Sequence, residues 1–200
     1  MGARGMSTIQ TLTETVIDRL FVPLEPISPH IRLTPRLCDA LLGTRLTGQR
    51  PLGHTGHYIA NQRLTLTAPG GQQALAVVGP PCREVVLALP EQTLAALKMG
   101  AGEAPVTLTG PRGQLTLTAR ITPLSPAVLL PPEAARRCGV SDGQQALLQI
   151  PAEMPIPSPR VAVIVREQAR PVAFLPGPEW EKWGLRPGDL GRIVPCAGRC

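Results

Sequence analysis

The sequence predicts a mainly β protein with short helices: two related closed β-barrels, formed by internal duplication, that follow an N-terminal amphipathic helix. Three observations support this fold class. Glycine (20) and proline (24) fill 44 of the 200 positions, and because helix interiors exclude both residues, a long-helix bundle or coiled coil is excluded. Apolar and polar residues alternate in short segments between Gly/Pro turns, as in β-strands. Several of these segments recur at a fixed offset along the chain.

The predicted N-terminal helix spans residues 7–20. Ser7 is a suitable N-cap, and Gln10 follows three residues later as in a capping box. Its apolar residues share one face: Ile9, Leu12, Val16, Ile17 and Leu20. Such a helix either packs on its own domain or docks on a partner surface, and the sequence leaves both uses open.

The predicted strands begin with residues 63–68, which alternate cleanly, as do residues 114–121. Turns are marked by Pro-Gly-Gly at residues 69–71 and Pro-Arg-Gly at residues 111–113. Residues 161–165 form a continuous apolar run that is typical of a buried strand. These patterns predict antiparallel hairpins rather than alternating strands and helices.

An internal repeat links two parts of the chain at an offset of 42 residues. Residues 66–72 match residues 108–114, and residues 86–91 (VLALPE) match residues 128–133 (VLLPPE). Each copy reads as a hairpin, a strand, a Pro-Glu turn and a short helix. Short strands, Gly/Pro turns and small helices fit closed barrels better than a sandwich.

A second repeat, at an offset of 45, relates residues 139–144 to residues 184–189. Together the repeats predict a first barrel over residues 29–124 and a second over residues 125–195. The segment 21–28 is predicted to complete the second barrel.

The net charge of +6 comes mainly from scattered arginines, with few aromatic residues. Without a basic run or aromatic platforms, nucleic-acid binding is not expected, whereas arginine suits a phosphorylated small molecule. No apolar stretch of 18 residues and no secretory signal pattern is present, so we expect no membrane span and a cytoplasmic protein.

The cysteines number five and include no Cys-x-x-Cys pair. They are Cys38, Cys82, Cys138, Cys196 and Cys200. The spacing of the last two could bind a metal, but no second half of such a site follows it. We expect reduced thiols.

Three groups of residues are candidates for chemistry. His30 and Arg32, two apart on a predicted strand, face the same side and suit an anion; they are candidate catalytic residues. His54 and His57 lie in a Gly-flanked loop that could hold a phosphate, a metal or a pantetheine chain, or could simply be solvated. The third group is a pair of turn arginines, Arg83 and Arg112, which either bind phosphate or lie in solvent.

Most of the chain, from about residue 9 to 194, resembles the PduL-type phosphate propanoyltransferases, the phosphotransacylases of bacterial microcompartments. Residues 7–20 stand where that family has an encapsulation helix, and residues 30–34 (His-Ile-Arg-Leu-Thr) stand at its His-x-His-Leu-Ser motif. Residues 53–60 match its Leu-Gln-Pro-Gly-Gln-Tyr-Ala-Ala stretch, and residues 127–135 match its second His-x-His motif. The resemblance implies two β-barrels, coenzyme A as a ligand, and conversion of acyl-CoA and phosphate to acyl phosphate and CoA with two divalent metals, expected to be zinc.

The chain departs from this family where the metal ligands are expected. The second imidazole of the first motif is Arg32, and the second motif has Ala127 and Leu129 in place of its histidines. The family's glutamate falls near Ala88, and its late histidine near residues 174–176. We therefore expect no metal site; at most His30 remains as a ligand.

Three hypotheses follow from the resemblance. The first is a catalytically degenerate family member that organises, assembles or regulates a microcompartment core and joins shell or core proteins through residues 7–20, as a homo- or hetero-oligomer in the lumen. The second is an active phosphate acyltransferase with an altered site. The third is a sensor that binds coenzyme A or acyl phosphate without turnover.

Overall fold

The computed structural model describes residues 21–52, 56–151 and 157–196. The predicted helix at residues 7–20 lies outside the described residues. The described chain divides into two compact units. One consists of Ile27–Ser125 with Pro176–Glu179; the other consists of Pro126–Leu175, the described residues up to Pro26 and those from Trp180 onward.

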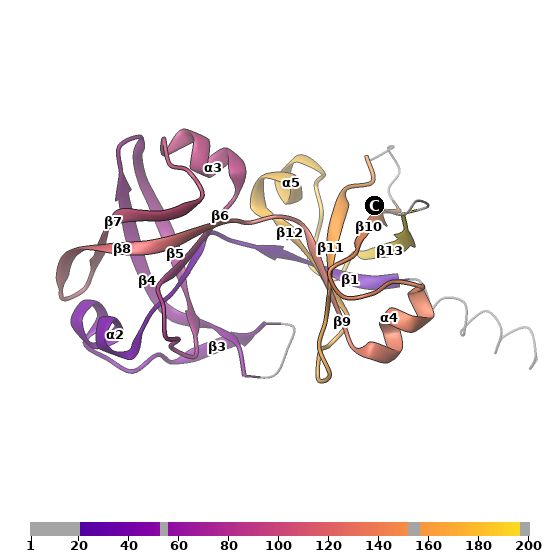
Figure 1. Cartoon of the computed structure of the whole chain (residues 1–200), viewed down its shortest axis with the longest axis horizontal. Helices are drawn as coiled ribbons and strands as arrows, with labels where there is room; N and C mark the ends of the chain where they lie inside the picture. Colours follow the sequence, from indigo (N-terminus) through magenta and orange to yellow (C-terminus); the bar gives the residue numbers. More distant parts are fainter. Residues whose placement is uncertain (1–20, 53–55, 152–156, 197–200) are drawn as a thin grey trace, which may run out of the picture. The chain divides into compact units, whose positions relative to one another are not determined.

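The first unit is a closed barrel of six strands in the order β4-β5-β2-β6-β8-β7, and pairing of β7 with β4 closes the ring (Figure 1). A seventh strand, β3 (Gly48–Pro51), extends the sheet beside β4. The ring strands are β2 (His30–Arg32), β4 (Tyr58–Ala68), β5 (Gly71–Gly79), β6 (Val86–Leu89), β7 (Gly102–Gly110) and β8 (Gly113–Pro123).

The second unit is also a closed six-stranded barrel, in the order β1-β12-β9-β11-β10-β13. The strand β1 comes from the start of the described chain and pairs antiparallel with β13 through Phe21–Pro23. The strands are β1 (Phe21–Ile27), β9 (Ala127–Leu130), β10 (Gln145–Gln149), β11 (Arg160–Val165), β12 (Val172–Pro176) and β13 (Leu190–Pro195). The mainly β fold class with two closed barrels is therefore confirmed.

The strands of the two barrels follow each other in the same cyclic order around the ring. In this order, β1 of the second barrel takes the place that β5 has in the first. Each barrel is also internally related, because residues that the repeats make equivalent are cross-strand partners. Leu66 pairs with Leu108, at the offset of 42. Val128 pairs with Ala173, at the offset of 45. A local two-fold relation between the halves of a barrel produces such pairs.

The strand order shows where the two copies of the offset-42 repeat lie. Both hairpins of that repeat, β4–β5 and β7–β8, lie in the first barrel, where β4 pairs with β7. The strands that follow the two hairpins lie in different barrels, since β6 belongs to the first barrel and β9 to the second.

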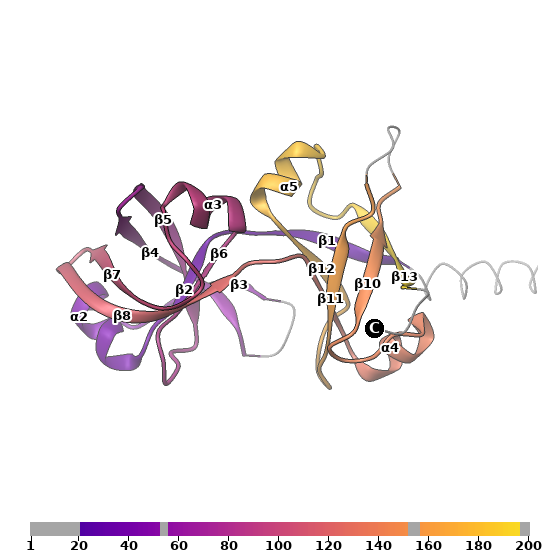
Figure 2. The same cartoon turned by 45° about the horizontal axis from the view of Figure 1, so that its top comes forward.

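Four short helices in the described residues each follow a short strand, with a proline at or next to the start of the helix. They are α2 (Pro35–Leu42), α3 (Glu91–Ala96), α4 (Pro132–Cys138) and α5 (Gly177–Lys182) (Figures 1 and 2). At α2, the Leu37 N–H donates to the Thr34 hydroxyl over 3.4 Å. The helix ends at Gly43, whose φ of 68° glycine adopts without strain.

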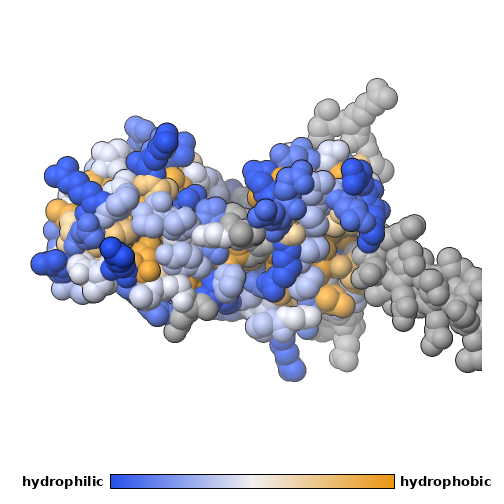
Figure 3. All heavy atoms as spheres, turned by 90° about the horizontal axis from the view of Figure 1, so that it is seen from below, coloured by the Kyte–Doolittle hydropathy of each residue, from blue (hydrophilic) through white to orange (hydrophobic). Residues whose placement is uncertain are grey.

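Each barrel is filled by the inward-facing residues of its own strands. In the first, Ile31, Leu66 and Leu108 are fully buried; in the second, Val128 and Ile193 are. On the face shown in Figure 3, hydrophilic side chains stand out from both units, with apolar residues between them. No helix of the described chain combines the length and apolar character that crossing a membrane requires.

Candidate functional site

The candidate residues His30 and Arg32 lie on strand β2 of the first barrel and point away from its core. Ile31 between them is fully buried in that core. Strand alternation therefore places both candidates on the outward face of β2, and both are partly buried. The predicted juxtaposition of imidazole and guanidinium is present.

The strand register defines two rows of side chains across this outward face. In the first row His30 pairs with Ala76 on β5 and with Ala88 on β6. Beyond Ala76 lies Arg63 on β4, which is exposed. Beyond Ala88 lies Thr122 on β8, whose hydroxyl donates to a backbone carbonyl over 3.4 Å. His30 therefore has methyl groups on both sides, and no acid follows it along the row.

The second row surrounds Arg32. It pairs with Val86 on β6, and the parallel register places Val78 of β5 on its other side. Beyond Val86 lies Arg120, which forms a 3.0 Å ion pair with Glu84. Arg32 thus has apolar neighbours on both adjacent strands.

His30 has a defined tautomer. Its Nδ1 lies 3.0 Å from the carbonyl oxygen of Ser28, and since a carbonyl only accepts, Nδ1 carries the proton and Nε2 the lone pair when the ring is neutral. Burial lowers the pKa of His30, the Arg32 charge lowers it further, and the Ser28 bond opposes both. The ring is therefore neutral at pH 7 and offers Nε2 as a base, an acceptor or a metal ligand.

Arg32 carries an unsatisfied donor. Its Nε is buried and has no hydrogen-bond partner among the described residues. Because the residues beside it on β5 and β6 are valines, neither can accept that bond. A guanidinium N–H can donate to an oxyanion, but this Nε has almost no contact with solvent, so an anion would reach it only if the side chain moved.

The other predicted site residues are not brought to this face as a group. His54 lies outside the described residues, and His57 is partly buried just before β4. Arg83 is exposed in the loop that precedes β6. Arg112 lies at the tip of the β7–β8 hairpin, with its N–H bonded to a carbonyl of α2 over 3.1 Å.

The position of Arg112 argues against a shared phosphate site with His30. It lies eight residues before Arg120, the first residue of β8 that pairs with β6, on the order of 25 Å of strand. Its side chain packs over Gly43, where an added Cβ would lie 2.3 Å from the Arg112 Cδ. Arg112 therefore supports the end of α2.

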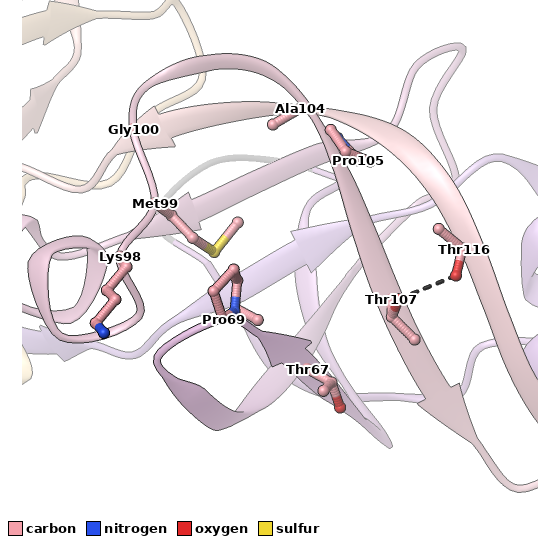
Figure 4. Close-up of a pocket in the computed structure, with 10 residues that line it drawn as sticks. Thr67, Pro69, Lys98, Met99, Gly100, Ala104, Pro105, Thr107 and Thr116 are labelled. Atoms are coloured by element: carbon pink, nitrogen blue, oxygen red, sulfur yellow. Dashed lines mark hydrogen bonds between the residues drawn. The ribbon is translucent and has the colours of Figure 1, made fainter.

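A pocket of about 510 Å³ lies elsewhere on the first barrel, between the β4–β5 turn and strands β7 and β8. In Figure 4 the Met99 side chain points toward Pro69, and the hydroxyls of Thr107 and Thr116 are bonded to each other, at 3.0 Å. Lys98 is its sole titratable lining residue. No predicted site residue lines it, and it lacks the acids, imidazoles and thiols that catalysis uses.

In the second barrel, the positions implied by the second His-x-His motif also face outward. Val128 and Leu130 lie in the barrel core, so Ala127 and Leu129 occupy the opposite face of β9. Ala127 pairs with Phe174 of β12. Two segments that the resemblance assigned to metal binding are therefore direct neighbours, as are His30 and Ala88 in the first barrel.

A family model described as phosphate propanoyltransferase matches residues 25–173. The chain belongs to this family. A phosphate propanoyltransferase of Clostridioides difficile (strain 630) is 22% identical over 202 aligned residues, which are 93% of this chain and 97% of the relative. The matched span contains β2, β6 and β9, so the family assignment covers the strands that carry the candidate positions.

The donor set of this member does not fit the zinc ions that we expected of the phosphate propanoyltransferase family. On the outward face of the first barrel His30 offers one nitrogen, while Ala76, Ala88 and Arg32 offer no ligand atom. In the second barrel Ala127, Leu129 and Phe174 are hydrocarbon. Across the described residues, no three His, Cys, Asp or Glu side chains come together as metal ligands, whereas a zinc site needs about three from the protein.

Sequence reasoning missed two features of this face. Arg63 was seen only as part of an alternating strand, although the register aligns it with His30 through Ala76. The unpartnered Nε of Arg32 was also not foreseen. Alternation shows which face a residue occupies, but only the strand register, which the sequence does not reveal, shows its neighbours.

No disulfide joins the four cysteines of the described chain.

Proposed function

We propose that this protein is a catalytically degenerate phosphate propanoyltransferase family member that organises, assembles or regulates the core of a bacterial microcompartment. The observation that carries the proposal is the register at the motif positions. Alanine faces His30 where the resemblance implies a glutamate, and alanine pairs with phenylalanine where it implies two histidines. Both barrels are present, but these positions carry hydrocarbon side chains, which cannot bind a metal.

The chemical consequence is a loss of transition-state stabilisation. A bound metal polarises the thioester carbonyl and stabilises the charge that develops when phosphate attacks it. Without such a group a site forfeits several kcal/mol, and every 1.36 kcal/mol is a factor of about ten in rate. We therefore expect a rate lower by roughly 10²-fold or more than that of a metal-loaded site.

The test is release of the coenzyme A thiol from propanoyl-CoA in the presence of phosphate, with the Clostridioides difficile phosphate propanoyltransferase as the positive control. We expect thiol release equal to a blank without protein. Robust turnover that depends on both phosphate and this chain would overturn the proposal.

One observation favours the active alternative. His30 presents Nε2 beside a cationic side chain, and such a base could take the proton of hydrogen phosphate as a phosphate oxygen attacks the thioester carbon. The C–S bond would break and the coenzyme A thiolate would receive that proton. If turnover is found, its loss in His30→Ala would establish this route.

The microcompartment role of the proposal rests on residues 7–20. The sequence spaces their apolar residues as on one face of a helix, which is the pattern that a docking helix requires. Deleting residues 7–20 leaves β1, which begins at Phe21 and pairs with β13, intact. We expect the deletion to release a folded protein from microcompartments. Unchanged co-purification with shells would contradict the docking role and the luminal location it implies.

A further inference from the structure

Two cysteines of the first barrel lie close together and take no part in the candidate site. Cys38 lies in α2, and Cys82 lies in the loop between β5 and β6. They belong to the same compact unit, and both carry free thiols. The fold brings them to one place although they are far apart in the sequence.

Both cysteines are neighbours of Leu33, the residue that joins β2 to the N-cap of α2. The Cys82 N–H donates to the Leu33 carbonyl over 2.8 Å, and the Cys82 Sγ lies 3.6 Å from the same oxygen. Leu33 directly precedes the N-cap Thr34, and Cys38 is the fourth residue of the helix. Side chains at these two positions often pack together at the start of a helix, and Leu33 and Cys38 share one buried cluster. Leu33 therefore has one cysteine at its carbonyl and the other at its side chain.

The two thiols also interact electrostatically. Burial raises the pKa of Cys38, and the neighbouring charges of Asp39 and Cys82 raise it further. Charges shift a neighbouring pKa mainly over about 4–6 Å, so the Cys82 sulfur is a close neighbour of Cys38. A disulfide needs the two Cβ atoms about 3.5–4.5 Å apart. A small shift of the Cys82 loop would bring them to that distance, and the other residues of this loop from Pro80 to Glu84 are exposed.

The exposure of the two thiols differs, which sets the order in which they react. Cys38 is 4% exposed, whereas Cys82 is only partly buried. A dissolved oxidant therefore reaches Cys82 first. Cys38 then reacts with the oxidised Cys82 from inside the protein and does not itself need to meet solvent.

We propose that Cys38 and Cys82 form a redox modification site, at which a small disulfide of the glutathione class oxidises the two thiols to an intramolecular disulfide. The Cys82 thiolate attacks one sulfur of the oxidant, and the other sulfur leaves as a thiol. The Cys38 thiolate then attacks the Cys82 sulfur, and the second glutathione thiol leaves. The two protein thiols lose two electrons to the oxidant, and their two protons end on the two glutathione thiols that are released.

The disulfide would join the start of α2 to the loop that leads into β6. This loop carries the exposed Arg83 and Glu84, which forms an ion pair with Arg120. A covalent bond resists the local opening that hydrogen bonds allow. Oxidation should therefore make this loop more rigid.

The test incubates the full chain with oxidised glutathione at pH 8, blocks the remaining thiols with iodoacetamide, and maps the peptides by mass spectrometry without reduction. We expect the Cys38 and Cys82 peptides to be joined in most chains, and to separate after treatment with dithiothreitol. Glutathione that stays on Cys82 while Cys38 is alkylated would overturn the inference, because the two sulfurs would then not meet. Alkylation of both cysteines, or a disulfide from Cys38 to any other cysteine, would overturn it as well.

Cys82→Ser and Cys196→Ser are matched variants, because each removes one partly buried thiol. Cys82→Ser should leave Cys38 as a thiol under the oxidant, whereas Cys196→Ser should form the disulfide of Cys38 and Cys82 at the yield of the unmodified chain. Loss of that disulfide in Cys196→Ser would show exchange through Cys196 and contradict a direct reaction. The peptide map of the unmodified chain decides the proposal even if a variant fails to fold.

Limited digestion with trypsin measures the consequence in the folded protein. Arg83 and Arg166 are exposed in loops of the first and the second barrel, respectively. Oxidation should slow cleavage after Arg83 by several-fold and leave cleavage after Arg166 unchanged, and dithiothreitol should reverse the effect. Equal rates of cleavage after Arg83 in the oxidised and the reduced protein would contradict the fixed loop. None of these measurements involves turnover, so their outcomes do not depend on the proposed function.

Discussion

Rebuilding the missing donors is the most informative perturbation of the first barrel. The double variant Arg32→His and Ala88→Glu places two imidazoles and a carboxylate on one outward face. Residue 88 is the antiparallel partner of His30, and directly opposed Cβ atoms lie about 4.5–5.5 Å apart. Residues two apart on β2 share that face. The three donors therefore converge on one point, as a zinc site requires.

The expected magnitude follows from burial and linkage. Ala88 is 6% exposed, so a carboxylate there without a partner costs roughly 1–3 kcal/mol or more. Zinc at a free concentration 100 times its Kd then restores about 2.7 kcal/mol. For a chain of 200 residues each kcal/mol moves Tm by about 2–4 °C, which predicts a zinc-dependent rise of about 5–10 °C.

The assay is a thermal melt of the double variant with and without zinc, beside wild type and an Arg32→His, Ala88→Gln control. The control keeps the shape of the glutamate but replaces the carboxylate with an amide, which is a much poorer zinc ligand. We expect the rise in the double variant alone. If zinc does not raise its Tm, or raises that of the control equally, the register argument for lost ligands is wrong.

Three further predictions concern the first barrel. The pKa of His30 is lowered, which means that the folded state resists protonation of this ring. An NMR titration should therefore give a midpoint below 6.5, and the free energy of unfolding should fall as the pH drops below 6.5. A midpoint above 6.5 would contradict the burial argument. Gly110→Ala would place a Cβ 2.5 Å from a carbonyl oxygen of α2 and should lower the free energy of unfolding in urea by about 1–3 kcal/mol. The control Gly100→Ala, whose Cβ would have nothing within 4 Å, should leave that free energy nearly unchanged. Equal effects of the two variants would contradict the packing of α2 on β7. Burial raises the pKa of the Cys38 thiol, so an alkylating reagent should modify Cys38 more slowly than the partly buried Cys82, as followed by mass spectrometry. Faster modification of Cys38 would count against that burial.

The fold was largely predictable because its signals are local. Alternation in residues 63–68 and the Pro-Gly-Gly turn that follows predicted the hairpin of β4 and β5, and the structure confirms it. The order of the ring was not predictable, because a repeat shows which segments are alike and not which of them pair. Leu66 and Leu108 are equivalent in sequence, and only the structure shows that they are direct cross-strand partners.

The candidate site was predictable in part. The two-residue spacing of His30 and Arg32 placed them on one face, as found. The surroundings of Arg112 could not be predicted, because a turn arginine has no periodicity that relates it to a distant strand; in the structure its side chain packs over Gly43 at the end of α2. The identity of the neighbours Ala76 and Ala88 depends on long-range register, which local sequence does not encode.

The central claim is that the family's barrels persist here without a metal site, and the metal content of the full chain tests it most directly. The protein is incubated with excess zinc and dialysed against metal-free buffer. Its zinc content is then measured by inductively coupled plasma mass spectrometry. The account predicts less than about one zinc per chain, because about three protein ligands are needed for each tightly held ion. Two zinc ions retained per chain would contradict it.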